Sequence, residues 1–466
     1  MISKYTDWLV YGAGLSALIL AERLGAAGKQ VLLVNPVKTW GGIFGGINVS
    51  GDIFDSGMTN FEFDLFGESD YNLQSYRSDC KRDVGRFVHY VQRYLSRFVD
   101  TSSLPTPSML FRNQSVGDLI ISNQFDVLKL LGLNERQIIR TELEYIVSKP
   151  NPLHPRTKDD YDSPLANLPF DQVSIANHGQ TFHRLFIEPM FRKVLGVPTS
   201  EIEGVFHRNG WAPLFYPETL ISQFGPTPQV LKPTTFRYPA DANFGAFIGR
   251  IEDAVRGLPN VRIIESAKDV KMDLDKSIMF VNDDVISFGR LAWGGDLSQL
   301  AEPLAEAQTA SHRASIDLFF LKVRDEGVSN RFTVLIDPEV ESPFYRVTNQ
   351  SICSGEKSDL HKIILECNSS NWIAEAPDSQ ALLNDALRRY KINPIAVESC
   401  HRRSFRNALT IPSTFHKDEF NRRHQIVSKK FPEVELIGPS SGYVSVTLND
   451  HIIQALKISQ KQGVLG

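Results

Sequence analysis

Three small residues near the start of the chain have the spacing of a phosphate-binding turn. Gly12, Gly14 and Ala17 form the pattern G-x-G-x-x-A, in which the first glycine permits a sharp turn and the second lets the backbone approach a pyrophosphate. The small third residue lets the following helix pack closely on its sheet. Leu15 and Ser16 begin that helix, where unpaired backbone N–H groups face a phosphate. We therefore predict that a dinucleotide binds at this turn.

The residues around the turn predict a strand, a helix and a second strand. An apolar run over 8–11 precedes the glycines, apolar residues follow at helical spacing as far as Leu24, and a second apolar run covers 31–34. Such a unit within about thirty residues is typical of a dinucleotide-binding fold. The alternatives are an ordinary glycine turn in an α/β sheet and a secretory signal. Asp7, the central glycines and the second strand argue against the signal.

The segment after the second strand favours one cofactor over another. Asn35 occupies the position where a carboxylate usually holds the adenosine ribose, and its amide can bond a hydroxyl but carries no charge. Gly41 and Gly42 follow, and such a pair is typical of a family of FAD proteins, in which the backbone passes close to the flavin diphosphate. The glycines continue to Gly57, which predicts a small hairpin and another glycine turn, with a surface loop as the alternative.

Composition excludes several other classes of protein. The 466 residues are too many for one compact core. A net charge of −4 removes any global case for nucleic-acid binding, and no apolar run reaches the roughly 18–20 residues that span a bilayer. We find no G-x-S-x-G motif and no metal-ligand cluster, so no side-chain nucleophile and no metal site are assigned. The cysteines lack a C-x-x-C pair, which favours a reducing, cytoplasmic location: Cys80, Cys353, Cys367 and Cys400.

Helical spacing dominates the region from 79 to 235. Residues 79–100 predict an amphipathic helix whose basic face is either solvated, the favoured interpretation, or meets an acidic partner. Helices are also predicted over 115–133, over 135–147, and over 178–196 with Pro189 near a kink. Five prolines between 149 and 169 predict a loop, which is either a lid over a site or a long connection.

Short strands dominate the rest of the chain. Those at 261–265, 278–281 and 290–293 could return to the first sheet, whereas a second, mainly antiparallel sheet is predicted from strands at 316–323, 332–336, 345–347 and 362–367. A helix is expected over 378–391. The chain ends with a strand at 435–437, a glycine-containing loop at Gly438 and a helix over 449–459, which again suits a phosphate or ribityl group.

These patterns predict an α/β protein. It has a Rossmann-type FAD-binding domain, an inserted helical domain and a second, mainly antiparallel β-sheet. The FAD-binding domain is expected to be discontinuous, from 1–78 with 236–300 and 400–466. The helical insert is expected over 79–235, and the antiparallel substrate domain over 301–399.

Five sequence motifs together resemble a flavoprotein superfamily that includes UDP-galactopyranose mutase, protoporphyrinogen oxidase, phytoene desaturase and monoamine oxidase. The resemblance covers most of the chain and is greatest to the UDP-galactopyranose mutase family. It rests on GAGLSA at 12–17 with the downstream glycine pair, FIEPMFRKVLG at 186–196, FRYPADANFG at 236–245, ESPFYRV at 341–347 and LIGPSSGYVSVTLND at 436–450.

The resemblance implies a set of substrate-binding residues. ESPFYRV is similar to the mutase stretch that places Tyr345 and Arg346 at the substrate diphosphate, and EIEGVFHRNGWAPLFY points to Arg208 as a second diphosphate ligand. A guanidinium supplies the permanent charge and paired donors that a diphosphate needs. Arg346 could equally pair with a structural carboxylate. In the terminal motif Tyr443 is kept from the family pattern for substrate, and Ser445 is expected near the cofactor.

Other positions depart from the mutase pattern. Leu195 replaces a tryptophan, Pro439 replaces an arginine, and Ser445 and Thr447 replace a tyrosine and an aspartate. The flavin scaffold therefore carries over better than the substrate.

The resemblance implies an FAD-dependent enzyme that acts on a nucleotide-linked sugar, as in polysaccharide biosynthesis. In the mutases reduced flavin N5 attacks the sugar during pyranose–furanose isomerisation, so no catalytic side chain is assigned and an external electron donor is required. One alternative is an FAD-dependent oxidase, dehydrogenase or desaturase acting on a small molecule. A further alternative is a non-catalytic flavin-binding protein. A homo-oligomer is compatible with either.

Overall fold

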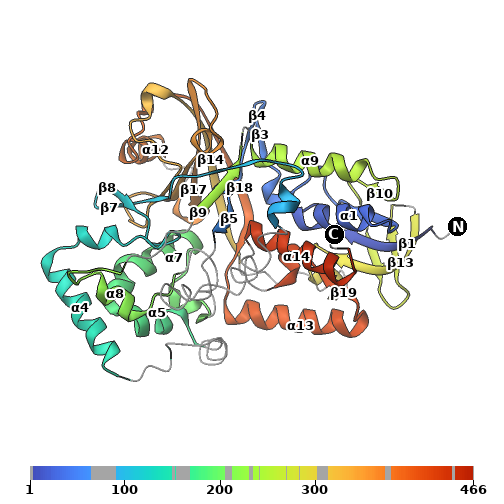
Figure 1. The fold of residues 1–466 in the computed structure, drawn as a ribbon, viewed down its shortest axis with the longest axis horizontal. Coiled ribbons are helices and arrows are strands. Elements are labelled where there is room, and N and C mark those ends of the chain that lie inside the picture. Colours follow the sequence, from blue (N-terminus) through green and yellow to red (C-terminus); the bar gives the residue numbers. More distant parts are fainter. Residues whose placement is uncertain are drawn as a thin grey trace.

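The computed structural model of the chain combines two large sheets with a group of helices (Figure 1). Both termini lie near the sheet drawn on the right, whereas the second sheet and the helical region form the other half of the molecule. The structure describes residues 4–64, 91–149, 153, 168–204, 213–229, 235–240, 242–268, 270–282, 284–301, 313–372, 379–442 and 447–464.

The first sheet is largely parallel and is assembled from distant parts of the chain. Its strand order is β10-β2-β1-β13, with β19 beside the end of β13. These strands are β1 (Lys4–Tyr11), β2 (Val31–Val34), β10 (Val261–Ile264), β13 (Asp284–Trp293) and β19 (Val434–Leu436). An antiparallel hairpin extends the sheet, made of β11 (Lys271–Asp273) and β12 (Ile278–Val281). The predicted return of the later strands to this sheet is confirmed.

Helices cover both faces of this sheet. Trp8 and Val10 of β1 pack into one hydrophobic cluster with α1, α9 and α14, whereas Leu9 and Tyr11 pack into another that includes Val427 of α13. Because both faces are buried, β2 is apolar at every position, and β1 and β13 end in apolar runs at 8–11 and 291–293 rather than alternating. The helices are α1 (Leu15–Ala26), α9 (Phe244–Arg256), α10 (Ser298–Ala301), α13 (Thr414–Lys430) and α14 (Leu448–Lys461).

The second sheet is antiparallel at every pairing except that of β15 with β7. Its strand order is β18-β14-β17-β16-β15-β7-β8. The strands are β7 (Ser108–Phe111), β8 (Gln114–Gly117), β14 (Arg313–Arg324), β15 (Val334–Ile336), β16 (Phe344–Asn349), β17 (Leu360–Asn368) and β18 (Val397–Thr410). The helix α12 (Ser379–Arg389) and the short α11 (Gln350–Ser354) accompany it.

Smaller elements connect the halves. Two short pairings are the hairpin of β3 (Ile47–Val49) with β4 (Asp52–Phe54) and a sheet of β5 (Phe61–Asp64), β9 (Thr235–Pro239) and β6 (Thr101–Ser103). The helical region holds α4 (Leu133–Val147), α5 (Phe170–His178), α6 (Gln180–Phe182), the π-helical η3 (His183–Ile187), α7 (Glu188–Leu195) and α8 (Pro217–Ser222). Within the described chain, no helix is both long and apolar enough to cross a membrane.

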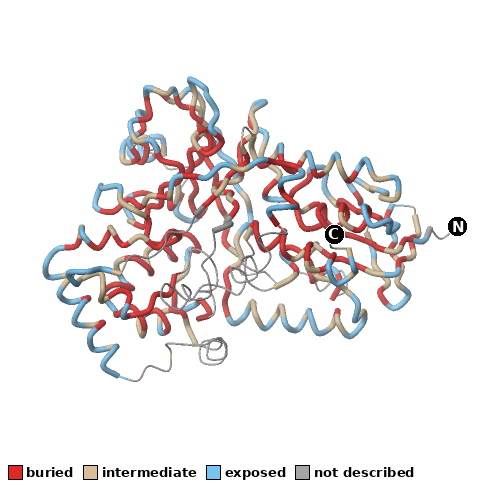
Figure 2. Tube along the Cα trace, viewed as in Figure 1, coloured by how far each residue is buried: buried red, intermediate tan, exposed pale blue. Residues whose placement is uncertain are grey.

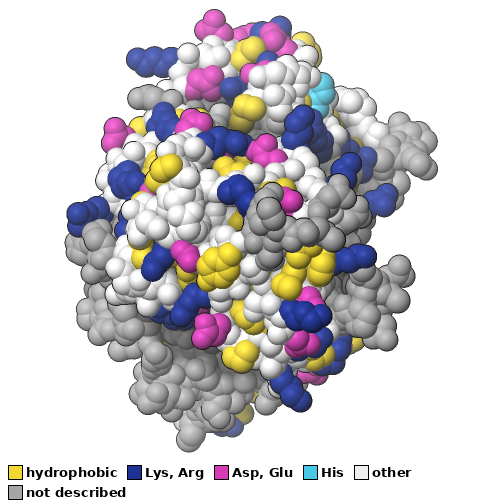
Figure 3. Space-filling view, turned by 90° about the vertical axis from the view of Figure 1, so that its right-hand side faces the viewer, with side chains coloured by type: hydrophobic (Ala, Val, Ile, Leu, Met, Phe, Trp, Pro, Cys, Tyr) yellow, Lys and Arg dark blue, Asp and Glu magenta, His cyan; other side chains and the backbone are white. Residues whose placement is uncertain are grey.

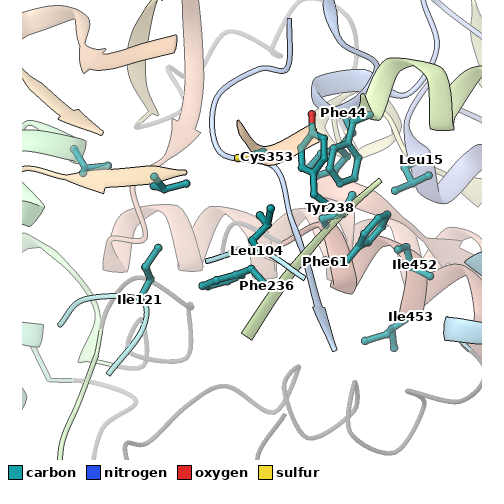
Figure 4. Close-up of a cluster of buried hydrophobic side chains, with 14 of the residues drawn as sticks. Leu15, Phe44, Phe61, Leu104, Ile121, Phe236, Tyr238, Cys353, Ile452 and Ile453 are labelled. Atoms are coloured by element: carbon teal, nitrogen blue, oxygen red, sulfur yellow. The ribbon is translucent and has the colours of Figure 1, made fainter. Parts of the chain in front are cut away.

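Burial follows the sheets. The central strands β1, β2, β14, β16 and β17 are mainly buried, whereas β18, α13 and the outer side of α4 are largely exposed (Figure 2). On the face in Figure 3, Lys and Arg side chains alternate with Asp and Glu side chains rather than gathering in one basic patch. Leu15, Phe44, Phe61, Phe236 and Tyr238 lie in the buried cluster of Figure 4, which joins α1 to β5 and β9.

Two predicted helices are wrong in part. Residues 115–133 form β8, a turn and the short η2 (Asp126–Leu130), because buried Asp118 accepts hydrogen bonds from the backbone N–H groups of Ile120, Ile121 and Ser122. The helix predicted over 178–196 begins only at Gln180, because Gly179 has φ +80° and separates it from α5; α6, η3 and α7 then follow one another to Leu195. Of the helix predicted over 79–100, residues 79–90 lie outside the described residues, as does most of the loop at 149–169.

Two long elements were missed from the sequence. β18 and α13 are mainly exposed, so their polar side chains give no regular apolar period.

Candidate functional site

The glycine turn lies at the carboxyl edge of the parallel sheet. The Gly12 N–H donates to the Val34 carbonyl at 2.9 Å, and the Gly294 N–H donates to the Tyr11 carbonyl at 2.7 Å. Gly12 has φ +138°, and a Cβ atom here would lie 3.4 Å from the Gly294 Cα. The turn is therefore fitted between the ends of β2 and β13, where an α/β sheet binds its ligands.

A second glycine pair faces the first. The Gly41 N–H donates to the Ala13 carbonyl at 2.7 Å, and a β-bridge joins Gly14 to Gly41. A Cβ atom on Gly42 would lie 3.5 Å from the Gly14 Cα, whereas a Cβ atom on Gly14 would meet no atom within 4 Å. Gly12, Gly14, Gly41 and Gly42 therefore form a glycine cradle that is open beside the start of α1. No side chain caps α1 at Gly14.

The side chains of Leu15 and Ser16 are occupied by contacts within the protein. Leu15 is fully buried. Ser16 Oγ donates to the His451 carbonyl at 3.0 Å and lies 3.0 Å from His451 Nδ1. Because the single hydroxyl proton goes to the carbonyl, the Nδ1–H of His451 donates to Ser16. Only backbone atoms of these two residues remain for a cofactor.

His451 links the cradle to the C-terminal loop. Burial lowers its pKa to about 4, so the ring is neutral at physiological pH. Its ring packs edge-on against Phe44, with 5.2 Å between centroids. A Cβ atom on Gly438 would lie 3.5 Å from His451 Cε1, and the Gly438 N–H donates to Gln454 Oε1 at 3.0 Å. The structure therefore brings Gly438 to the start of α1. Tyr443 and Ser445 lie outside the described residues.

Asn35 is fully buried and shapes the chain that leads to the glycine pair. Its Oδ1 accepts from the Val37 N–H at 2.8 Å, and its Nδ2 donates to the Thr39 carbonyl at 3.2 Å. Such a side-chain turn fixes the local backbone. Asn35 therefore directs Trp40 and Gly41 toward Gly14, with one donor and one acceptor of its side-chain amide already in use.

Glu366 joins the first half of the molecule to the second sheet. Arg346 Nε and Nη2 donate to its two carboxylate oxygens at 2.6 Å each, and the Tyr345 hydroxyl donates at 3.3 Å. The Met58 N–H donates to the same carboxylate at 3.1 Å. Gly57 has φ +102°, and a Cβ atom on it would lie 2.6 Å from the carboxylate. The structure thus brings Gly57, Tyr345 and Arg346 together.

The pairing sets the charge of Arg346. Burial would lower the pKa of Arg346, but the charge and hydrogen bonds of Glu366 raise it above its ordinary value. Burial raises the pKa of Tyr345, and the negative Glu366 raises it further. Both side chains therefore keep their protons, and the positive charge of Arg346 is balanced. Arg208, the other predicted diphosphate ligand, lies outside the described residues.

A buried carboxyl group beside this region was not predicted. Asp55 accepts from the Tyr238 hydroxyl and from the Phe244 N–H, and its own N–H donates to Gln350 Oε1 at 2.8 Å. Burial raises the pKa of Asp55 to about 7, although these hydrogen bonds lower it. Asp55 therefore anchors the start of α9 to the loop that carries Gly57. The only sequence signal was the acidic residue before Ser56-Gly57.

Among the described residues, no group of three or more His, Cys, Asp or Glu side chains could hold a metal ion.

Solved structures share this fold, although no protein-family model and no curated protein matches the sequence. Reduced UDP-galactopyranose mutase is 17% identical, with a TM-score of 0.73 over 99% of this chain and 94% of that chain. Cyclohexylamine oxidase from Brevibacterium oxydans IH-35A is 14% identical, with a TM-score of 0.59 over 98% and 99%. Putrescine oxidase bound to putrescine is 10% identical, with a TM-score of 0.58 over 99% and 100%.

The resemblance that the sequence motifs indicate is therefore confirmed at the level of the fold.

Proposed function

We propose that this chain binds FAD at the glycine cradle and is a flavoenzyme. The observation that carries the proposal is the open space at Gly14, where a Cβ atom would meet no atom within 4 Å. The first N–H groups of α1 have no acceptor within the helix, and they carry the positive end of its dipole. A diphosphate is the ligand that such a helix start favours.

The residues that would hold FAD are those of the cradle and the backbone at Leu15 and Ser16. Gly57 and Gly438 are further candidates because both have positive φ angles, and Gly438 lies next to His451, which contacts Ser16. Asn35 would act by holding the cradle loop in place. Bound FAD would supply either a two-electron acceptor or, in its reduced form, a nucleophilic nitrogen.

We infer that the parallel sheet is the core of a Rossmann-type FAD-binding domain with a helical insert. The boundaries expected from the sequence serve as the starting proposal. β18 spans residue 400, and β7 and β8 fall within 79–235, yet all three strands pair in the second sheet. We therefore propose that the substrate domain, which contains the second sheet, also includes β7, β8 and β18.

For the reaction, we propose isomerisation of a nucleotide-linked sugar between its pyranose and furanose forms. The motif around Tyr345 and Arg346 supports this proposal, because a diphosphate could be held by the donors that Arg346 has left. Glu366 takes Nε and Nη2, whereas among the described residues the one hydrogen-bond partner of Nη1 is Met58 Sδ, at 4.0 Å. Glu366 would thus orient the guanidinium and leave one edge for the substrate.

The second candidate is an FAD-dependent oxidoreductase on a small molecule. The balanced charge of Arg346 favours this candidate, since a neutral ion pair attracts an anionic substrate less than a free arginine. Leu195 and Pro439, which replace mutase residues, favour it also.

One experiment separates the candidates. Purified protein is loaded with FAD, its absorbance spectrum is recorded, and a panel of nucleotide sugars is incubated with oxidised and dithionite-reduced samples. The isomerase proposal requires furanose product only in the reduced sample, without net redox change. Bleaching of the flavin by a small molecule, reversed by oxygen, would instead establish the oxidoreductase. Failure to bind FAD would refute both.

The diphosphate role of Arg346 has its own test. Arg346→Ala should weaken nucleotide-sugar binding at least tenfold and leave FAD bound. Arg402→Ala is the matched control, because Arg402 pairs with buried Asp317 on the same sheet. If the two variants bind nucleotide sugars equally well, the assignment of Arg346 is wrong.

A further inference from the structure

The edge of the parallel sheet carries a carboxylate on a different strand from the usual one. β10 lies beside β2 in parallel, with Ile264 in register with Val34. The Asn35 N–H donates to the Ile264 carbonyl at 2.8 Å. Glu265, the first residue after β10, therefore stands level with Asn35 at the same edge. It is the only acidic residue directly after any of the five parallel strands.

The contacts of Glu265 connect it to the glycine cradle. Its Oε1 accepts from Trp40 Nε1 at 3.2 Å and is paired with Arg256. Trp40 is buried and directly precedes Gly41, whose N–H is bonded to Ala13. One indole hydrogen bond thus ties the carboxylate to the loop that faces Gly14.

The second oxygen of Glu265 remains available. Within the part of the chain that the structure describes, both hydrogen bonds to the carboxylate go to Oε1, and none goes to Oε2. The side chain is 43% exposed, in contrast to Asn35, which is fully buried. The hydrogen bond from Arg256 lowers the pKa of Glu265, so the group is ionised at neutral pH.

We propose that Glu265 binds the adenosine ribose of FAD, with Oε2 accepting hydrogen bonds from the ribose hydroxyls. The inference rests on the proposed FAD site and supplies the charged acceptor that Asn35 cannot provide. A carboxylate suits a pair of neighbouring hydroxyl donors, and a hydrogen bond to a charged acceptor is roughly twice as strong as a neutral one.

A purely structural role for Glu265 makes a different prediction. If the carboxylate only held Trp40 and Arg256, its loss would weaken the binding of every ligand of the cradle by the same factor. If it contacts the ribose, its loss matters only when the ribose hydroxyls are present. FAD and its analogue with 2′,3′-dideoxyadenosine in place of adenosine separate these cases.

The test is the dissociation constant of each ligand, measured by flavin fluorescence on apoprotein. Glu265→Gln keeps an oxygen for Trp40 and removes the charge. It should weaken the binding of FAD about tenfold and change the affinity of the dideoxy analogue less than threefold. Glu252→Gln is the control, since Glu252 also pairs with Arg256 but does not follow a strand. It should bind FAD as the wild type does.

Two outcomes overturn the inference. One is a Glu265→Gln variant that binds FAD as tightly as the wild type. The other is an equal loss of affinity for both ligands. In either case wild-type binding of FAD leaves the proposed function intact. A wild-type protein that binds neither ligand refutes the proposed function itself, and the inference with it.

Discussion

Arg346 on β16 and Glu366 on β17 are paired across neighbouring strands, and two hydrogen bonds of 2.6 Å join them. The side chain of Glu366 is 3% exposed and that of Arg346 is 23% exposed. Because the same carboxylate accepts from the Met58 N–H, the ion pair also holds the loop that carries Gly57 against the second sheet.

Glu366→Gln should therefore lower the free energy of unfolding by about 3 kcal/mol, since removing one partner leaves a charge with little access to water. Urea unfolding followed by circular dichroism measures the change. Glu144→Gln is the control, because its pair with Arg140 is half exposed on α4 and should cost less than about 0.5 kcal/mol. Equal losses in the two variants would mean that the Arg346–Glu366 pair contributes no more than a surface pair.

Gly14→Ala should separate binding from folding. A Cβ atom here meets nothing within 4 Å, and the φ of −77° suits alanine, so the melting temperature of the apoprotein should stay within about 2 °C of wild type. The methyl group would occupy the space proposed for the diphosphate, and FAD affinity should fall at least tenfold. Equilibrium dialysis against FAD gives the affinity, and unchanged binding would refute the proposed position of the diphosphate.

Two further glycines serve as controls for that variant. Gly249 lies within α9, where a Cβ atom also meets no atom within 4 Å. Gly249→Ala should leave FAD binding unchanged and the fold equally or more stable. Gly41→Ala should instead destabilise the fold, because its φ is +86° and a Cβ atom would lie 2.7 Å from the Gly45 Cα.

The sequence allowed the first sheet to be predicted well because its strands are buried on both faces. Residues 31–34 are apolar at every position and all are buried, and Gly12, with φ +138°, is required by the turn itself. Local composition and spacing were sufficient here.

Other elements depend on neighbours that are remote in sequence. β18 is exposed along most of its length and is recognisable as a strand only through its pairing with β14. α13 likewise buries only Val427. The sequence could not show that Arg346 would meet Glu366, twenty residues away, or that Tyr238 would donate to Asp55. Such pairs arise from tertiary packing rather than from local preference.

Asn35→Asp should be harmful, although it restores the acidic residue usual at this position. Asn35 Nδ2 donates to the Thr39 carbonyl at 3.2 Å in a fully buried site. A carboxylate there would lose the donor and face a carbonyl oxygen, at a cost of about 1–3 kcal/mol. Thermal unfolding measures the loss. Asn48→Asp is the control, because Asn48 is exposed and uses only its oxygen, toward the Gly51 N–H, and it should change stability little.

His451 should make folding stability fall as the pH is lowered. In the folded protein its pKa is about 4, against 6.5 for an ordinary histidine, so the unfolded chain binds the proton first. The stability associated with neutral His451 is therefore complete above pH 6.5 and is lost as the pH falls from 6.5 to 4. Between pH 7 and pH 5 the loss should be about 2 kcal/mol.

Other buried groups titrate over the same range, so the measurement must compare the wild type with a variant. Burial also lowers the pKa of His183, so this residue too makes folding stability fall as the pH is lowered. Burial raises the pKa of Asp55 to about 7 and that of Asp118 to about 6. These two carboxyl groups therefore make folding stability rise as the pH is lowered, in opposition to the histidines. His451→Gln removes one contribution and leaves the others. Its unfolding free energy should change less between pH 7 and pH 5 than that of the wild type, by about 2 kcal/mol. Identical pH profiles would show that His451 is not held neutral by the packing of α14 against Ser16 and Phe44.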